Sequence, residues 1–155
     1  MTTPADDSHG ASGDDADAAY ANSLYAKIGG DAEVRGLVDR FYAAMDTLPE
    51  AATIRAMHPR SLQSSNEKLY EFLSGWLGGP QLYVEKRGHP RLRRRHLPFA
   101  IGSAEAAAWM TCMATALDGL PARVSPMLRE TLRGQLGQVA AFMRNQPGDS
   151  PGDEG

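Results

Sequence analysis

The most informative stretch for the fold is Gly88-His89-Pro90-Arg91-Leu92-Arg93-Arg94-Arg95-His96-Leu97-Pro98-Phe99. Pro90 and Pro98 bound a segment too short for an ordinary helix, and each lacks a backbone N–H, so the flanks fix the direction of the chain at His96. An imidazole on an element of fixed direction suits a metal ligand. The spacing of His89 and His96 alone identifies no site, because neither a zinc-binding helix pair nor a Cys-x-x-Cys motif accompanies it. A histidine in such a run is most often only hydrogen-bonded.

Further motifs precede and follow this stretch. They are Phe41-Tyr42, then Phe72-Leu73-Ser74-Gly75-Trp76-Leu77-Gly78-Gly79-Pro80-Gln81-Leu82-Tyr83, and finally Trp109-Met110-Thr111-Cys112-Met113. In this order, from about Leu24 to Arg144, the chain closely resembles the group II (O-type) truncated haemoglobins. The resemblance implies an all-α, globin-like fold, a two-over-two helical sandwich around haem b. It also implies that His96, the second histidine of the motif, is the proximal iron ligand.

Length and composition favour one globular domain. A chain of 155 residues with 42% hydrophobic residues can bury a real core. The formal net charge of -3 argues against a nucleic acid or an anionic membrane as partner. We find no export signal and no apolar run long enough to span a membrane, and the single Cys112 cannot form an intramolecular disulfide. We therefore expect a cytoplasmic protein.

Composition divides the chain into three parts. Residues 1–22 are acidic and nearly free of large apolar side chains, so we expect a disordered extension there. Residues 23–146 form the expected globin domain, and residues 147–155 a disordered tail.

Helical periodicity dominates the domain. Asp31 is a candidate N-cap for a first helix with an apolar face at Val34, Leu37, Val38, Phe41, Tyr42 and Met45. A second helix repeats the pattern from Leu69 and must end at Gly78-Gly79-Pro80. Ser103 is a candidate cap for a third, and Ser125-Pro126 opens a fourth. Such faces occur in any helical bundle, so periodicity predicts the fold but not the function. In the family, the proximal segment is mostly loop with one short helix.

The resemblance assigns three side chains to the distal side of the haem, where they would stabilise a bound ligand: Tyr42, Trp109 and His58. Each has a plainer interpretation. A buried tyrosine can satisfy its hydroxyl on a carbonyl, and a buried tryptophan can simply fill space. His58 could be a surface loop residue before Pro59, or could even coordinate the iron itself.

The resemblance also assigns cofactor contacts. Arg95 and Lys68 are candidates for the anionic haem propionates. The other expected haem contacts are Ser65, Leu69, Phe72, Trp76 and Phe99. Ser65 stands where longer globins carry a distal histidine, and outside the family it would be an ordinary solvent-facing helix residue. The arginine run could likewise be only a solvated surface. Cys112 is expected to be a small buried hydrophobe.

We therefore expect a haem protein that binds O2, CO and NO, with oxygen transport among its possible roles. The alternative is a haem enzyme, a nitric oxide dioxygenase or a peroxidase, that uses a separate reductase because the chain carries no flavin or nicotinamide domain. A sensor or a haem-free helical bundle is a third possibility. A monomer and a homodimer are both compatible with the sequence.

Overall fold

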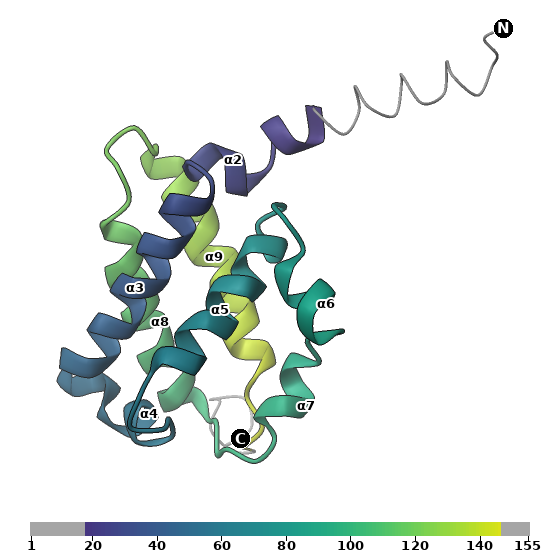
Figure 1. Ribbon diagram of the computed structural model, residues 1–155. Helices are drawn as coiled ribbons and strands as arrows, with labels where there is room; N and C mark the ends of the chain where they lie inside the picture. The colour runs from purple at the N-terminus through teal and green to yellow at the C-terminus, as the bar shows by residue number, and fades with distance from the viewer. Residues whose placement is uncertain (1–17, 147–155) are drawn as a thin grey trace, which may run out of the picture.

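The computed structural model describes residues 18–146, and in this range every regular element is a helix (Figure 1). The elements in chain order are α2 (Leu24–Ile28), α3 (Asp31–Thr47), the 3-10 turn η1 (Pro49–Ala51), α4 (Ala52–Ala56), α5 (Gln63–Trp76), α6 (Leu82–Arg87), α7 (Leu92–His96), α8 (Ser103–Asp118) and α9 (Pro126–Phe142). Residues 18–21 are also helical, and the disorder expected of the two tails otherwise falls on residues 1–17 and 147–155, outside the described part of the chain. No helix between residues 18 and 146 is long and apolar enough to cross a membrane.

Helix starts follow local capping chemistry. The hydroxyl of Ser125 accepts a hydrogen bond from the N–H of Leu128, which confirms the predicted start of α9. The other two predicted caps are wrong by one position. Gly30 and Gly102 are the N-caps of α3 and α8, and Asp31 and Ser103 are the first helical residues.

Four long helices make two layers. Helix α3 packs against α5 and α8, and α8 packs against α9, so that α8 and α9 lie behind α3 and α5 in Figure 1. The shared core consists of fully buried apolar side chains from all four helices, including Val38, Phe41, Leu73, Cys112, Met113, Leu117, Leu132 and Leu136. The predicted all-helical sandwich is confirmed.

The turn after α5 requires glycine. Gly78 has a φ of 97°, a left-handed conformation that favours glycine. A Cβ on Gly79 would lie 2.4 Å from the ring of Tyr25, so only glycine lets α2 pack against this turn. The turn therefore fixes where the chain leaves α5 toward α6.

The segment between α5 and α8 contains two short helices, α6 and α7, where the family pattern led us to expect one. Gly88, with a φ of 85°, ends α6, and Arg91, with a φ of 49°, directly precedes α7. The pair Leu82 and Tyr83 gives α6 an apolar contact that a plain loop would not need, and Tyr83 is buried. Helix α7, in contrast, has no buried residue.

Candidate functional site: a cavity between α5, α7 and α8

A cavity of about 490 Å³ lies between the two layers and is closed on one side by α7. Ten of the eleven side chains predicted for the site line it. They are Tyr42, His58, Ser65, Lys68, Leu69, Phe72, Arg95, His96, Phe99 and Trp109. The volume is in the range of sites that hold small organic ligands and cofactors.

Tyr42 reaches the cavity from the buried face of α3. Its side chain is 8% exposed, and its hydroxyl donates to the carbonyl oxygen of Ser65 over 3.3 Å. That distance is long for an O–H donor, so the bond is weak and the hydroxyl can be redirected at little cost. Burial raises the pKa of Tyr42 far above its ordinary value of 10.0. The phenol is therefore a neutral hydrogen-bond donor throughout the physiological range.

Trp109 faces the same cavity from α8. Phe41 holds both rings in place: its centroid lies 5.2 Å from that of Trp109 and 4.9 Å from that of Tyr42, with the tyrosine at a right angle. Edge-to-face packing of this kind adds specificity to burial. Among residues 18–146 the indole N–H of Trp109 has no hydrogen-bond partner, so it is available to a molecule in the cavity.

His58 stands in the corner after α4. Its Nδ1 lies 2.8 Å from the carbonyl oxygen of Ile54, and since a carbonyl only accepts, Nδ1 carries the proton. In the neutral ring Nε2 is then an acceptor. The imidazole packs edge-on against Tyr42, with centroids 6.0 Å apart. His58 thus lies beside the Tyr42 ring and lines the same cavity.

His96 occupies the last position of α7, on the opposite wall. Its Nδ1 lies 2.6 Å from the carbonyl oxygen of Leu92, one turn earlier. The same argument puts the proton on Nδ1 and leaves the lone pair of Nε2 unused. A backbone carbonyl that fixes tautomer and ring direction in this way is the usual support of a metal-binding histidine.

Cationic side chains lie at the edge of the cavity. Lys68 and Arg95 both line it and are both exposed, and the Nε of Arg95 donates to the carbonyl oxygen of Pro90 over 2.8 Å. Glu105 also lines the cavity, but its carboxylate accepts from the N–H of Gly102 over 2.7 Å and is used as a helix cap. The two cations therefore face any anionic group at the rim.

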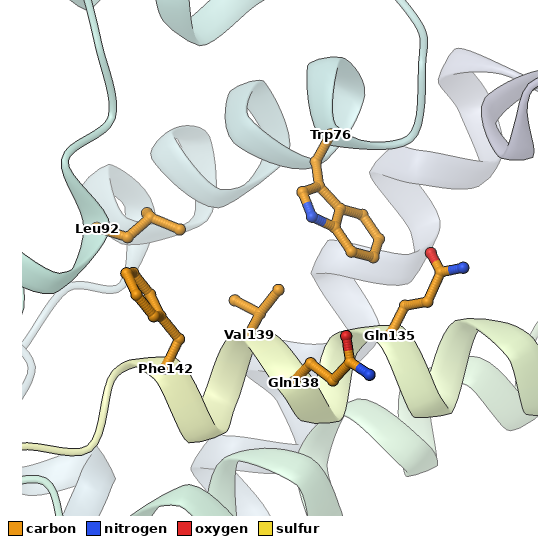
Figure 2. Close-up of a pocket in the computed structure, with 6 residues that line it drawn as sticks. All are labelled: Trp76, Leu92, Gln135, Gln138, Val139 and Phe142. Carbon is orange, nitrogen blue, oxygen red and sulfur yellow. The ribbon is translucent and has the colours of Figure 1, made fainter.

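Trp76 does not line this cavity, in contrast to its predicted place. It lies one turn beyond Phe72, at the end of α5, and lines a separate open groove of about 470 Å³ with Leu92, Gln135, Gln138, Val139 and Phe142 (Figure 2). Leu92 and Val139 separate the groove from the cavity, since each of these two side chains lines the groove on one side and the cavity on the other.

Most of the apolar lining was not predicted from the sequence. The C-terminal helix α9 contributes Leu136, Val139, Ala140 and Met143, α4 contributes Ile54, and the loops contribute Met57, Pro59 and Ile101. The α9 residues carry the same periodic signal as core residues, so no pattern in the sequence separates the two roles. Pro59 and Ile101 depend on how the loops close around the cavity.

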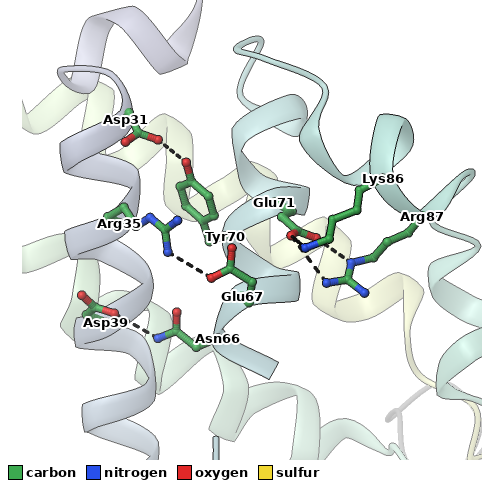
Figure 3. A network of polar contacts seen from close by, with 9 residues as sticks. All are labelled: Asp31, Arg35, Asp39, Asn66, Glu67, Tyr70, Glu71, Lys86 and Arg87. Atoms are coloured by element: carbon green, nitrogen blue, oxygen red, sulfur yellow. Dashed lines mark hydrogen bonds and ion pairs between the residues drawn. The ribbon is translucent and has the colours of Figure 1, made fainter. Parts of the chain in front are cut away.

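A polar network ties α5 to its two neighbours (Figure 3). On one side Tyr70 donates to Asp31, and Arg35 stacks over the Tyr70 ring at 3.6 Å. On the other side Glu71, 3% exposed, accepts from Arg87 over 2.6 Å and pairs with Lys86 over 3.2 Å. The hydrogen bond from Arg87 lowers the pKa of Glu71 below its ordinary value. This ion pair fastens α6, the first helix of the segment between α5 and α8, to α5.

The donor set fits haem. Within residues 18–146 no group of three or more His, Cys, Asp and Glu side chains could hold a bare metal ion. One imidazole with a free Nε2 suffices only where another molecule supplies the remaining ligands, as a porphyrin does. The apolar walls suit a macrocycle, and Lys68 and Arg95 suit its propionates.

Comparison with known proteins agrees with this chemistry. The model of the Bacterial-like globin family matches residues 23–145. The Group 2 truncated hemoglobin YjbI of Bacillus subtilis (strain 168) is 40% identical over 127 residues, which cover 81% of this chain and 90% of the relative.

Solved structures show the same likeness. The Group II 2-on-2 hemoglobin of the plant pathogen Agrobacterium tumefaciens is 50% identical, with a TM-score of 0.76 over 80% of this chain and 95% of that one. The cold-adapted truncated hemoglobin of the Antarctic bacterium Pseudoalteromonas haloplanktis TAC125 is 43% identical, with a TM-score of 0.77 over 81% and 99%. The chain belongs to the bacterial-like globins and, within them, to the group II truncated haemoglobins, a family whose cofactor is haem b.

Proposed function

We propose that the protein binds oxygen and other diatomic gases at a haem b held by His96, with Tyr42 and Trp109 as hydrogen-bond donors to the ligand. The single observation that carries this proposal is the opposition of two kinds of side chain across one cavity. His96, with its unused Nε2, lines one wall, and two neutral donors line the other. His96 would hold the iron of a bound haem, and that iron would supply the binding site for a small ligand.

The distal residues determine which ligand is favoured. The phenol of Tyr42 and the indole of Trp109 favour a ligand whose outer atom accepts hydrogen bonds, and oxygen is a better acceptor there than carbon monoxide. A hydrogen bond to a charged or strongly polarised group contributes about 1.5 to 3 kcal/mol, or roughly ten- to hundredfold in the rate of release. His58 orients the Tyr42 ring by edge-on packing. Lys68 and Arg95 hold the propionates, and the apolar walls exclude water.

The absorption spectrum tests the proposal. Purified protein, reconstituted with haem where needed, is recorded in the ferric, reduced and CO-bound states. We expect a Soret band that shifts on reduction and again with CO, because the distal side is open to a ligand. A protein that forms no stable haem complex would contradict the proposal.

A second measurement distinguishes an oxygen carrier from a haem enzyme. The cavity holds its donors rigidly, which favours slow release of oxygen and hence consumption of the gas over delivery. Nitric oxide is added to the oxygen-loaded protein, and nitrate is counted. One nitrate per haem supports the dioxygenase alternative, with electrons from a separate reductase; fast reversible oxygen release without nitrate supports transport.

The proposal includes a location in the cytoplasm. Cys112, the single cysteine, is buried and unpaired, which suits that compartment.

A further inference from the structure

The end of α9 is bonded to the loop that follows His96. The side-chain amide of Asn145 donates to the carbonyl oxygens of His96 over 3.2 Å and Phe99 over 2.9 Å, and its Oδ1 accepts from the N–H of Ile101 over 3.0 Å. The backbone N–H of Asn145 donates to the carbonyl oxygen of Ile101 over 2.8 Å. One half-buried residue thus makes four hydrogen bonds with the loop from His96 to Ile101.

Among residues 18–146, few other contacts hold this loop, one of them the bond from the N–H of Gln146 to the carbonyl oxygen of Ile101. No residue of α7 is buried, Leu97 is 57% exposed and Phe99 is 39% exposed. The neighbouring contact is also polar: Nη1 of Arg93 donates to the carbonyl oxygens of Phe142 and Arg144, at the end of the same helix α9. Since apolar burial is slight, the hydrogen bonds of Asn145 largely determine the position of the loop.

We propose that Asn145 is a positioning residue for the proximal ligand. Two directions must be fixed for the Nε2 of His96 to face the iron. The bond from Nδ1 to the carbonyl of Leu92 sets the rotation of the ring, and the bond from Asn145 to the carbonyl of His96 sets the backbone from which the ring projects. The inference rests on the proposed function, because it takes His96 as the ligand.

The amide group itself suggests the decisive variants. Asn145→Asp keeps the size and the acceptor for Ile101, but removes both donors and sets a carboxylate against two carbonyl oxygens. Asn145→Ala removes all three side-chain bonds to the loop, together with the bond that Oδ1 accepts from Nε2 of Gln146, and leaves the backbone bond. Asn66→Ala is the matched control, because this half-buried amide donates to Asp39 between α3 and α5 and makes no hydrogen bond with the loop (Figure 3).

The experiment uses the full haem-loaded chain and two readouts. Resonance Raman of the reduced protein measures the iron–histidine stretching band, and transfer to an excess of a haem-free acceptor globin measures the rate of haem loss. We expect a shifted or broadened band and roughly tenfold faster haem loss in both Asn145 variants, as the loss of two or more hydrogen bonds implies. Asn66→Ala should leave both unchanged.

The outcomes separate the inference from the function on which it rests. A wild-type chain that binds no haem overturns the proposed function. A wild-type chain that binds haem, with variants of unchanged band, overturns the inference alone, even where haem loss is faster, because a merely stabilising contact would not move the band. Far-UV circular dichroism establishes that the variants are folded, and Asn145→Asp carries the test if Asn145→Ala is not.

Discussion

The two walls of the cavity are built by different physics. On the distal side, Phe41 is fully buried and holds Tyr42 and Trp109 by ring packing. On the proximal side, no residue of α7 is buried, and its position depends on the hydrogen bonds of Arg93 and of the loop that follows His96. Apolar packing preorganises the two proposed donors to the ligand, whereas the proposed iron ligand lies on a segment with little packing of its own. We therefore expect the bond to the cofactor to stabilise the segment around His96.

The largest effect should follow from removing the proximal bond itself. His96→Ala leaves no nitrogen for the iron. Since loss of a hydrogen-bond partner of a metal ligand alone costs roughly ten- to hundredfold in affinity, we expect haem loss to be roughly a hundredfold faster or more. His89→Ala is the control, because His89 is exposed and its Nδ1 accepts only from the N–H of Arg91. Haem content by absorbance measures both. Equal retention of haem in the two variants would show that the proximal assignment is wrong.

The difference in packing between the distal and proximal walls can be tested by truncating one apolar side chain on each wall. Phe41→Ala opens a cavity in the core and should lower the free energy of unfolding by about 3 to 5 kcal/mol. Leu97→Ala, on the exposed proximal loop, should change it by less than about 0.5 kcal/mol. Urea denaturation followed by circular dichroism measures the difference. Similar losses from both variants would remove the distinction between the two walls.

The ion pair at the start of the proximal segment should make stability depend on pH. Because Arg87 lowers the pKa of Glu71 in the folded protein, the stabilisation is fully present above the ordinary carboxylate value of 4.5 and is lost as pH falls through the lower, folded value. Glu71→Gln should cost about 2 kcal/mol at neutral pH and flatten the acid limb of the stability curve. Glu85→Gln, on the exposed face of α6, is the control. If the acid limb of Glu71→Gln is as steep as that of the wild type, the loss of stability at low pH comes from other carboxylates.

The smallest effects should come from single distal donors. Tyr42→Phe and Trp109→Phe each remove one donor while keeping the ring, so we expect oxygen release to be roughly tenfold faster in each and CO release to change much less. Stopped-flow mixing and flash photolysis measure the two rates. The fold should be unaffected, because Phe41 still packs on both rings. Equal acceleration of oxygen and CO release would indicate an opened path rather than lost hydrogen bonds.

The sequence predicts some elements around the cavity better than others. The long helices α3, α5, α8 and α9 were predictable from period and capping, because each must bury one apolar face. The positions of Tyr42 and His96 followed from the family motifs. The short helices α2, α4 and α6 were not predicted, since five or six residues give no clear period. Trp76 lies in the adjoining groove, because a motif or a helical face does not tell where along the helix the cavity ends.

Polar fastenings are the least predictable part of the molecule. Asn145 looks like an ordinary residue after a helix, and Glu71 like a carboxylate on the solvent face of a helix. Their roles arise from segments that lie far apart in the chain: Asn145 meets the loop at His96 to Ile101, and Glu71 meets Lys86 and Arg87. Only the folded arrangement brings these groups together.

Hydrogen exchange of the chain with and without haem tests the contrast between the walls most directly. We expect haem to raise the protection of backbone amides in residues 89–101 by more than tenfold, since there the cofactor replaces missing packing, and to change the amides between Val34 and Met45 in α3 far less. Equal gains in both regions, or a larger gain in α3, would contradict the account.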